Sequence, residues 1–206
     1  MITVIAGVNG AGKSSVAGAS IRLVGGEYFN PDEVARQLQS NDTSLSLYDA
    51  NSKAWKIGYD QLVYAITQDI DYIYETTLGG NSITQCLQEA IESGGQIRIF
   101  YIGLSSPELH VERVKYRVSK GGHDIPEEKI RERYVSSIHN MMSLLPGCEQ
   151  VVVFDNSTSM NDNQAELKKL FTVNAGRITI VEQTMPLWAK PLAATGLKYF
   201  KHKQIS

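Results

Sequence analysis

The segment from Gly7 to Ser14 places glycines, a lysine and a hydroxyl at the spacing of a phosphate-binding loop, G-x-x-x-x-G-K-[ST]. Glycines let the backbone curl until its N–H groups converge on a phosphate, and the helix that follows adds positive potential. Lys13 would bridge the β- and γ-phosphates, and the Ser14 hydroxyl would be a metal ligand for Mg²⁺. We therefore expect ATP and Mg²⁺ as cofactors. The residues expected to bind the nucleotide are Gly7, Asn9, Gly10, Ala11, Gly12, Lys13, Ser14 and Ser15.

Other nucleotide-binding patterns are weaker in this chain. There is no Asn-Lys-x-Asp guanine-reading motif, which favours ATP over GTP, and no G-x-G-x-x-G at the offset of a dinucleotide site. The segment from Ser93 to Gln96 mimics the signature of transporter ATPases. In those proteins the signature opens a helix, whereas here it closes one, and the strand that follows carries no carboxylate.

Two carboxylates follow predicted strands. Asp32 comes after a short strand at residues 27–29, and Glu75 ends a strand at residues 71–75. In a parallel sheet both lie at the carboxyl edge, beside the phosphate loop, where a kinase needs a group to hold the acceptor hydroxyl. The alternative for Asp32 is a helix-start residue that satisfies backbone N–H groups. Glu75 closes a buried run and needs a polar partner.

Seven of the 20 basic residues fall within residues 110–133. Arg113 and Arg117 are four residues apart and share a helix face. Arg131 and Arg133 are about 200° apart on the next helix, so they cannot both point at one phosphate. A Gly-Gly pair at 121–122 supplies a hinge, which predicts a basic lid that closes over ATP. The alternative is a solvated face with local glutamate partners.

These residues require a scaffold, and strands alternate with helices along the whole chain. The pattern predicts an α/β fold: a P-loop NTPase or kinase-like three-layer sandwich with a mostly parallel sheet, helices on both faces and a helical lid insertion at about 106–145. We expect one domain over 1–190 and a C-terminal tail over 191–206. A helix is predicted over 161–171. The apolar stripe of the helix from Lys53, which includes Trp55 and Val63, is interpreted as core packing.

Composition narrows the function classes. The 206 residues are 42% hydrophobic and 20% charged, which is typical of a globular domain and excludes a disordered or collagen-like chain. With 20 basic and 22 acidic residues the net charge is −2, and neither a nucleic acid nor a membrane is expected as a partner. Cys86 and Cys148 form no metal-binding or disulfide pattern. We see no signal peptide and no membrane span, and therefore expect a cytoplasmic protein.

Four segments together resemble the zeta toxin family of P-loop kinases. They are the phosphate loop, Asn-Pro-Asp32, Tyr-Glu75-Thr-Thr-Leu, and a lid that reads Arg-Val-x-x-Arg117-Val and then Gly-Gly-His123-Asp-Ile-Pro. The resemblance covers about residues 1–190. It implies a kinase that transfers the γ-phosphate of ATP to the 3′-hydroxyl of the amino sugar in UDP-N-acetylglucosamine. Several members are toxins held inactive by a small antitoxin, so an antitoxin is an expected partner.

The resemblance also implies roles for individual residues. Asp32 would be the base that aligns and deprotonates the sugar hydroxyl, and Glu75 would contact the substrate. Arg117 and one of Arg131 and Arg133 would clamp the transferring phosphate. The expected catalytic residues are Asp32, Lys13, Arg117, Arg131 and Arg133. The expected substrate-binding residues are Asp32, Glu75, Thr76, Thr77, Arg113 and His123.

Other functions stay open at this point. The chain is short and leaves little room for a sugar-nucleotide platform, so another sugar nucleotide or an unrelated small molecule is an alternative acceptor. A metabolic small-molecule kinase with a nontoxic acceptor would use the same residues. A nucleotide-binding partner module of a toxin-antitoxin system would bind ATP without transferring its phosphate.

Overall fold

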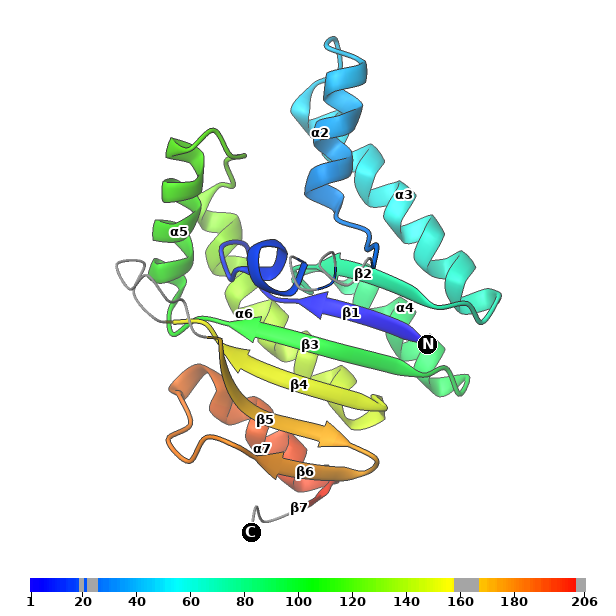
Figure 1. Ribbon diagram of the computed structural model, residues 1–206, viewed down its shortest axis with the longest axis vertical. Coiled ribbons are helices and arrows are strands. Elements are labelled where there is room, and N and C mark those ends of the chain that lie inside the picture. The colour runs from blue at the N-terminus through cyan, green and yellow to red at the C-terminus, as the bar shows by residue number, and fades with distance from the viewer. Residues whose placement is uncertain (19–20, 22–25, 158–166, 203–206) are drawn as a thin grey trace.

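The computed structural model describes residues 1–18, 21, 26–157 and 167–202, and its strands form one sheet in the order β2-β1-β3-β4-β5-β6-β7 (Figure 1). The strands are β1 Ile2–Ala6, β2 Tyr72–Thr76, β3 Ile97–Gly103, β4 Gln150–Asp155, β5 Lys168–Asn174, β6 Arg177–Ile180 and β7 Lys201–His202. The strands β1 to β4 are parallel to one another, and β5 is antiparallel to both β4 and β6. The mostly parallel α/β sheet predicted from the sequence is confirmed.

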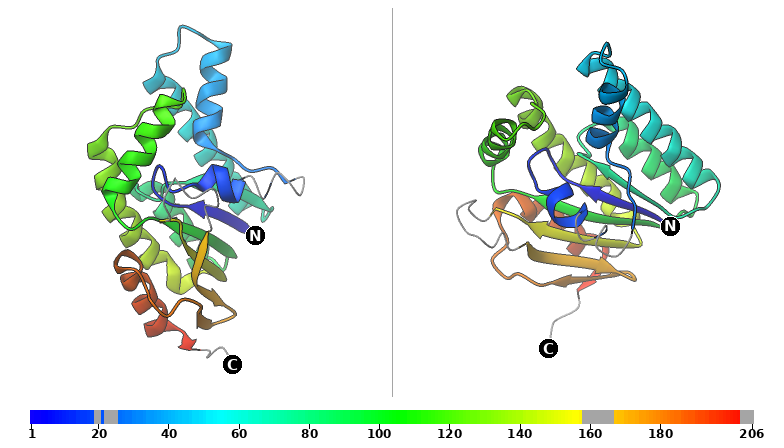
Figure 2. Two further views of the ribbon diagram at one scale, coloured as in Figure 1. Left: turned by 60° about the vertical axis from the view of Figure 1, so that its left-hand side comes forward. Right: turned by 45° about the horizontal axis from the view of Figure 1, so that its top comes forward.

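Helices gather mainly on one face of this sheet. The α-helices are α2 Pro31–Asn41, α3 Leu47–Thr67, α4 Asn81–Glu92, α5 Pro107–Ser119, α6 Glu127–Leu144 and α7 Lys190–Tyr199. Leu62 of α3, Leu87 of α4 and Met141 of α6 are fully buried in one cluster with Val4 and Ile99 of the sheet. The helical turn η1 (Lys13–Gly18) lies over the opposite face (Figures 1 and 2). Burial of this apolar surface supplies the main driving force for folding.

The chain after β4 differs from the expectation. Residues 168–171, predicted as the end of a helix, begin β5, and residues 161–166 lie outside the described part of the chain. Phe171 and Val173 lie opposite Val153 and Val151 of β4, and this cross-strand pairing outweighs the local helical pattern. Ala175 has a φ of +48° and Gly176 a φ of +70°, which forms the tight turn into β6.

The predicted lid consists of α5 and α6, which pack on each other and on the phosphate loop. Val111 and Val114 of α5 and Ile130 of α6 form a small buried cluster with Val8 of the loop. Figure 1 shows α5 and α2 on either side of the phosphate-loop segment.

The segment expected as a tail begins within α7, whose Leu192 is fully buried against the sheet. It continues into β7, which pairs with β6. None of the helices in the described ranges is long and apolar enough to cross a membrane.

Candidate functional site

The phosphate loop turns sharply between β1 and η1, and its glycines allow this turn. Gly7 has a φ of +146° and Gly10 a φ of +83°, a region that residues with a Cβ rarely adopt. At Gly10 a Cβ would also lie 2.9 Å from the carbonyl oxygen of His110. The segment expected to bind the nucleotide therefore lies at the carboxyl end of β1, the edge where parallel sheets bind ligands.

Lys13 is buried at the end of this loop. Its side chain is 8% exposed, and its Nζ donates to the carbonyl oxygen of Val8 at 3.4 Å and lies 3.9 Å from Glu75 Oε1. Burial lowers the pKa of Lys13 below its ordinary value of 10.5, while the nearby Glu75 and Asp32 carboxylates oppose this shift. An anionic phosphate at the loop would therefore stabilise the charged ammonium.

Ser14, Glu75 and Asn30 form one hydrogen-bonded group beside Lys13. Ser14 Oγ donates to Glu75 Oε1 at 3.1 Å and Oε2 at 3.0 Å. Asn30 Nδ2 donates to Ser14 Oγ at 3.1 Å and to Glu75 Oε2 at 3.2 Å. Burial raises the pKa of Glu75, and Lys13 and the Ser14 hydrogen bond act against this. Glu75 thus has the polar partners that its buried position requires.

The same oxygen atoms suit Mg²⁺. A hydroxyl and a carboxylate are hard donors, and Mg²⁺ in kinases is bound by one or two carboxylates together with phosphate oxygens. Among the described residues, no group of three or more histidine, cysteine, aspartate or glutamate side chains could hold a metal ion. Ser14 and Glu75 supply the hydroxyl and carboxylate oxygens that Mg²⁺ prefers, directly beside the phosphate loop.

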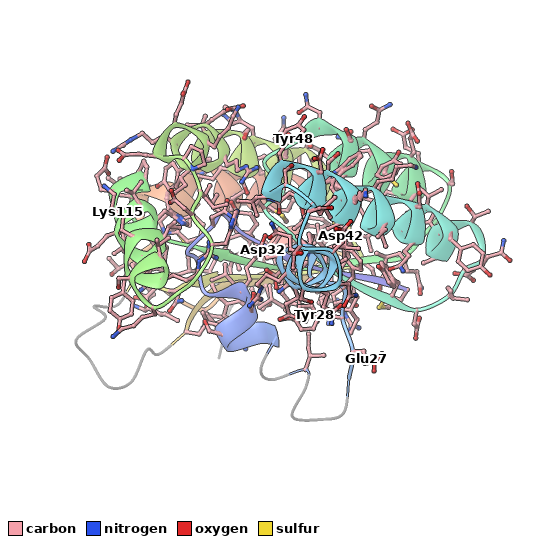
Figure 3. All side chains as sticks on the ribbon, turned by 90° about the horizontal axis from the view of Figure 1, so that it is seen from above. Glu27, Tyr28, Asp32, Asp42, Tyr48 and Lys115 are labelled. Atoms are coloured by element: carbon pink, nitrogen blue, oxygen red, sulfur yellow. The ribbon has the colours of Figure 1, made fainter. Side chains whose placement is uncertain are left out.

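Asp32 lies at the start of α2 but does not cap this helix. The side chain of Asn30 is the cap, because its Oδ1 accepts from Asp32 N at 3.0 Å and from Glu33 N at 3.4 Å. The Asp32 carboxylate is left to face the lid, where its Oδ2 lies 3.8 Å from Arg117 Nη1. Figure 3 shows Asp32 and Tyr48 on neighbouring helices, with Lys115 on the outer side of α5.

The lid arginines divide into two groups. Arg133 Nη1 donates to Asn9 Oδ1 in the phosphate loop at 2.9 Å, and Arg117 Nη2 donates to the carbonyl oxygen of His123 at 2.7 Å. Arg131 instead donates to Glu108 at 2.6 Å and to Glu127 at 2.8 Å, outside the cavity lining. The structure therefore brings Arg133 into the cavity lining and Arg117 next to Asp32, although Arg117 itself does not line the cavity. Arg131 instead forms solvent-exposed pairs with glutamates, which is the alternative that the sequence left open for the basic residues of the lid.

The loop after β2 is shaped by its own threonines and held by α6. Thr76 Oγ1 accepts from Leu78 N at 3.0 Å, and Thr77 Oγ1 accepts from Gly79 N at 3.3 Å. Ser137 of α6 donates to the carbonyl oxygen of Thr77 at 2.8 Å. These bonds allow Leu78 to keep a φ of +54°. The loop is therefore fixed before any substrate binds.

A cavity of about 710 Å³ lies between the phosphate loop, α2, the loop after β2 and the lid, and Lys13, Asp32 and Arg133 are among its lining residues. Five of the expected substrate residues line it: Asp32, Glu75, Thr76, Thr77 and His123. Arg113 is elsewhere, since its Nη2 donates to the carbonyl oxygen of Asn156 at 2.6 Å. This volume falls within the range of about 300–1,000 Å³ for small-molecule sites. The cavity therefore has more room for an acceptor than the short length of the chain led us to expect.

One wall of the cavity is formed by α3, which the sequence pattern did not predict as part of the site. Tyr48, Asn51 and Trp55 of α3 line it, and Trp55, interpreted as a core residue, is 43% exposed and stacked on Tyr59 with ring centroids 5.2 Å apart. Their spacing of three, four and seven residues places them on one helix face, which was the available signal. Asn30 was also missed, although it directly precedes Pro31 and Asp32.

Comparison with solved structures shows the fold. The complex of AvrRxo1-ORF1 with AvrRxo1-ORF2 matches with a TM-score of 0.68 and 15% identity, over 97% of this chain and 76% of that chain. The same pair with ATP matches at 0.64 and 15% identity, over 98% and 76%. The PezAT toxin-antitoxin system of Streptococcus pneumoniae matches at 0.55 and 13% identity, over 98% and 78%.

Comparison of sequences shows the family. An uncharacterized protein of Haemophilus influenzae is 34% identical over 131 residues, which cover 62% of this chain and 88% of that protein. The family model described as zeta toxin matches residues 1–167. Because this match includes the phosphate loop, Asp32, Glu75 and the lid, and extends over most of the chain, the chain belongs to the zeta toxin family and has a P-loop kinase-like fold.

Proposed function

We propose that the protein is an ATP-dependent kinase that transfers the γ-phosphate to a hydroxyl of a sugar nucleotide such as UDP-N-acetylglucosamine. The observation that carries this proposal is that Lys13, Asp32 and Arg133 line the same cavity from three different elements. Phosphoryl transfer depends on this combination of phosphate contact, acceptor base and positive charge.

Each residue has a distinct role in this reaction. The phosphate loop and Lys13 bind the triphosphate, and Ser14 with Glu75 would hold Mg²⁺, which neutralises phosphate charge when bound. Asp32 accepts the proton of the acceptor hydroxyl. The acceptor oxygen then forms a bond to the γ-phosphorus as the bond to the ADP oxygen breaks. Arg117 and Arg133 stabilise the charge on the transferring group.

The cavity supports a sugar nucleotide as acceptor. Tyr48 and Trp55 offer flat apolar surfaces that suit a heterocyclic base or a sugar ring, and Asn51 between them offers amide donors and acceptors. Arg133 and Lys129 of α6 also line the cavity; Arg133 brings the positive charge that a diphosphate would require, whereas Lys129 is paired with Glu132. A metabolic kinase with a nontoxic acceptor would use the same residues, and growth arrest on expression separates the two.

A protein partner is proposed on separate grounds. Two of the structures with the same fold are described as a complex of two chains and as a toxin-antitoxin system. We propose a small antitoxin as partner of this chain, and a cytoplasmic location, in which Cys86 and Cys148 stay free thiols as they are here.

The test is ADP release from purified protein with Mg·ATP, with and without UDP-N-acetylglucosamine. We expect acceptor-dependent turnover, and the Asp32→Asn variant should retain ATP binding while losing about 10²- to 10⁴-fold in rate. Asp60→Asn, in an exposed pair with Lys56 on α3, is the matched control. Undiminished turnover by the Asp32→Asn variant would contradict the assignment of Asp32 as the base. ATP binding without acceptor-stimulated ADP release would favour the alternative of a nucleotide-binding partner module of a toxin-antitoxin system.

A further inference from the structure

Two carbonyl groups of the phosphate loop each accept a hydrogen bond from a buried side chain. His110 Nδ1, in α5, lies 2.8 Å from the carbonyl oxygen of Asn9, and Asn156 Nδ2, just after β4, lies 2.8 Å from that of Ala11. His110 is 1% exposed and Asn156 is 3% exposed. The loop is therefore held from outside by the lid on one side and by the sheet on the other.

Both donors are themselves fixed. Burial lowers the pKa of His110 to about 4, so the ring is neutral at neutral pH and its Nδ1 carries the proton that Asn9 accepts. Tyr134 lies edge-on to the ring with centroids 5.7 Å apart. The backbone N–H of Asn156 donates to Gly103 at 3.0 Å, and its carbonyl accepts from Arg113. The His110 ring is therefore held by aromatic packing as well as by its hydrogen bond, and the backbone that carries the Asn156 side chain is anchored at both its N–H and its carbonyl.

Peptide geometry gives these contacts a consequence for phosphate binding. In a trans peptide the C=O of one residue and the N–H of the next point in opposite directions. Holding the Asn9 carbonyl toward His110 therefore turns the N–H of Gly10 to the other side of the loop. In the same way, the bond from Asn156 to Ala11 orients the N–H of Gly12. Inward-facing N–H groups are what a phosphate needs from such a loop.

We infer that His110 and Asn156 are positioning residues that orient the N–H groups of Gly10 and Gly12 before a nucleotide arrives. This inference rests on the proposed function, since it requires ATP on this loop. Neither residue lines the cavity, so each acts through the loop and not on the acceptor. Their effect should therefore appear in ATP affinity and in KM for ATP, and much less in KM for the acceptor.

The test compares two substitutions at one position. His110→Leu removes the donor, whereas His110→Asn keeps an amide N–H near the place of Nδ1. We expect the Leu variant to raise the Kd for Mg·ATP about tenfold, as loss of one buried hydrogen bond predicts, and the Asn variant to restore it to within about threefold of wild type. His139→Leu, on the exposed side of α6, controls for loss of a histidine.

A substitution at a second position keeps the inference testable if the His110→Leu variant does not fold. Asn156→Asp keeps the side-chain volume but replaces the donor to Ala11 by an acceptor, and it should weaken ATP binding at least as much. Wild-type affinity in folded His110→Leu or in Asn156→Asp, or an equal loss in the Leu and Asn variants of His110, overturns the inference. If the wild-type chain itself does not bind Mg·ATP, the proposed function fails and not merely this part of it.

Discussion

Ser14 and Glu75, 61 positions apart in sequence, are directly hydrogen-bonded through the Ser14 hydroxyl and both carboxylate oxygens. They meet because β1 and β2 are adjacent parallel strands that end together, with Ile5 opposite Glu75 and Ala6 opposite Thr76. The phosphate loop therefore begins beside the Glu75 carboxylate, which belongs to the neighbouring strand β2.

Glu75→Gln should weaken the response to Mg²⁺. The amide keeps the shape and can still accept from Ser14, but it removes the charge that supports a metal-binding hydroxyl. We expect the Mg²⁺ concentration for half-maximal ADP release to rise roughly tenfold, the size of effect seen when groups that support metal ligands are changed. Glu89→Gln, on the exposed face of α4, is the control. An unchanged Mg²⁺ dependence would remove Glu75 from the metal site.

Arg133 and Arg131 form a matched pair on one helix. Arg133→Gln should lower kcat by about 10³-fold, because an arginine that stabilises the transferring phosphoryl group contributes this much or more. Arg131→Gln breaks only exposed pairs with Glu108 and Glu127 and should leave kcat within about twofold, since such pairs contribute little. Equal rates for the two variants would contradict the proposed clamp. Single-turnover measurements with saturating ATP make the comparison.

Trp55→Ala should affect the acceptor and not ATP. Loss of a stacking surface costs about 1–3 kcal/mol per base, so KM for the acceptor should rise roughly tenfold while KM for ATP stays constant. Tyr64→Ala, on the same helix and 62% exposed, lies outside the cavity lining and is the control. Steady-state kinetics with each substrate varied in turn decides between these outcomes. An acceptor KM equal to that of wild type would mean that this wall does not bind the acceptor.

Alanine substitutions at two glycines distinguish the energetic cost of backbone strain from that of steric contact. Gly10 and Gly121 have φ of +83° and +85°, but a Cβ would approach His110 at Gly10 and meets nothing within 4 Å at Gly121. Gly121→Ala should cost about 1 kcal/mol in unfolding free energy. Gly10→Ala should cost clearly more and should also weaken ATP binding. Chemical denaturation and ATP titration of both variants test this, and equal costs would show that the contact with α5 is unimportant.

His110 should make the protein sensitive to acid. Its folded-state pKa of about 4 lies below its ordinary value of 6.5, so the unfolded chain binds the proton more readily. The stability from this residue is complete above pH 6.5 and is lost as the pH falls toward 4, by about 3 kcal/mol in total. His110→Asn should flatten this part of the profile of unfolding free energy against pH. A profile identical to that of wild type would show that His110 is not buried as a neutral ring.

The sequence predicted the parts of the site that depend on local pattern. The phosphate loop follows β1, Glu75 lies near the end of β2, and parallel pairing brings such positions to one edge. The strand predicted at 27–29 is reduced to a single bridge between Phe29 and Tyr74, which still places Asp32 at this edge. Helical spacing also showed that only one of Arg131 and Arg133 could face a phosphate. It could not show which one, because periodicity gives relative and not absolute orientation; Glu108, 23 positions away, pairs with Arg131.

Other features depend on contacts that no local pattern contains. Trp55 has the spacing of a core residue. It is exposed to the cavity because α2 and the lid line this cavity with it and do not fill it. Residues 168–171 adopt a strand because β4 is available for pairing. His110 and Asn156 lack a recognisable motif, since their partners are backbone carbonyl groups 101 and 145 positions away.

The packing of Val8 links the opening of the phosphate loop to that of the lid. Val8 belongs to the small cluster of α5 and α6 and not to the main core, so the loop and the lid share one set of apolar contacts. Their backbone amides should therefore exchange with solvent deuterium in a single cooperative event, separate from the slower opening of the central strands. A ligand that orders either segment would slow exchange in both.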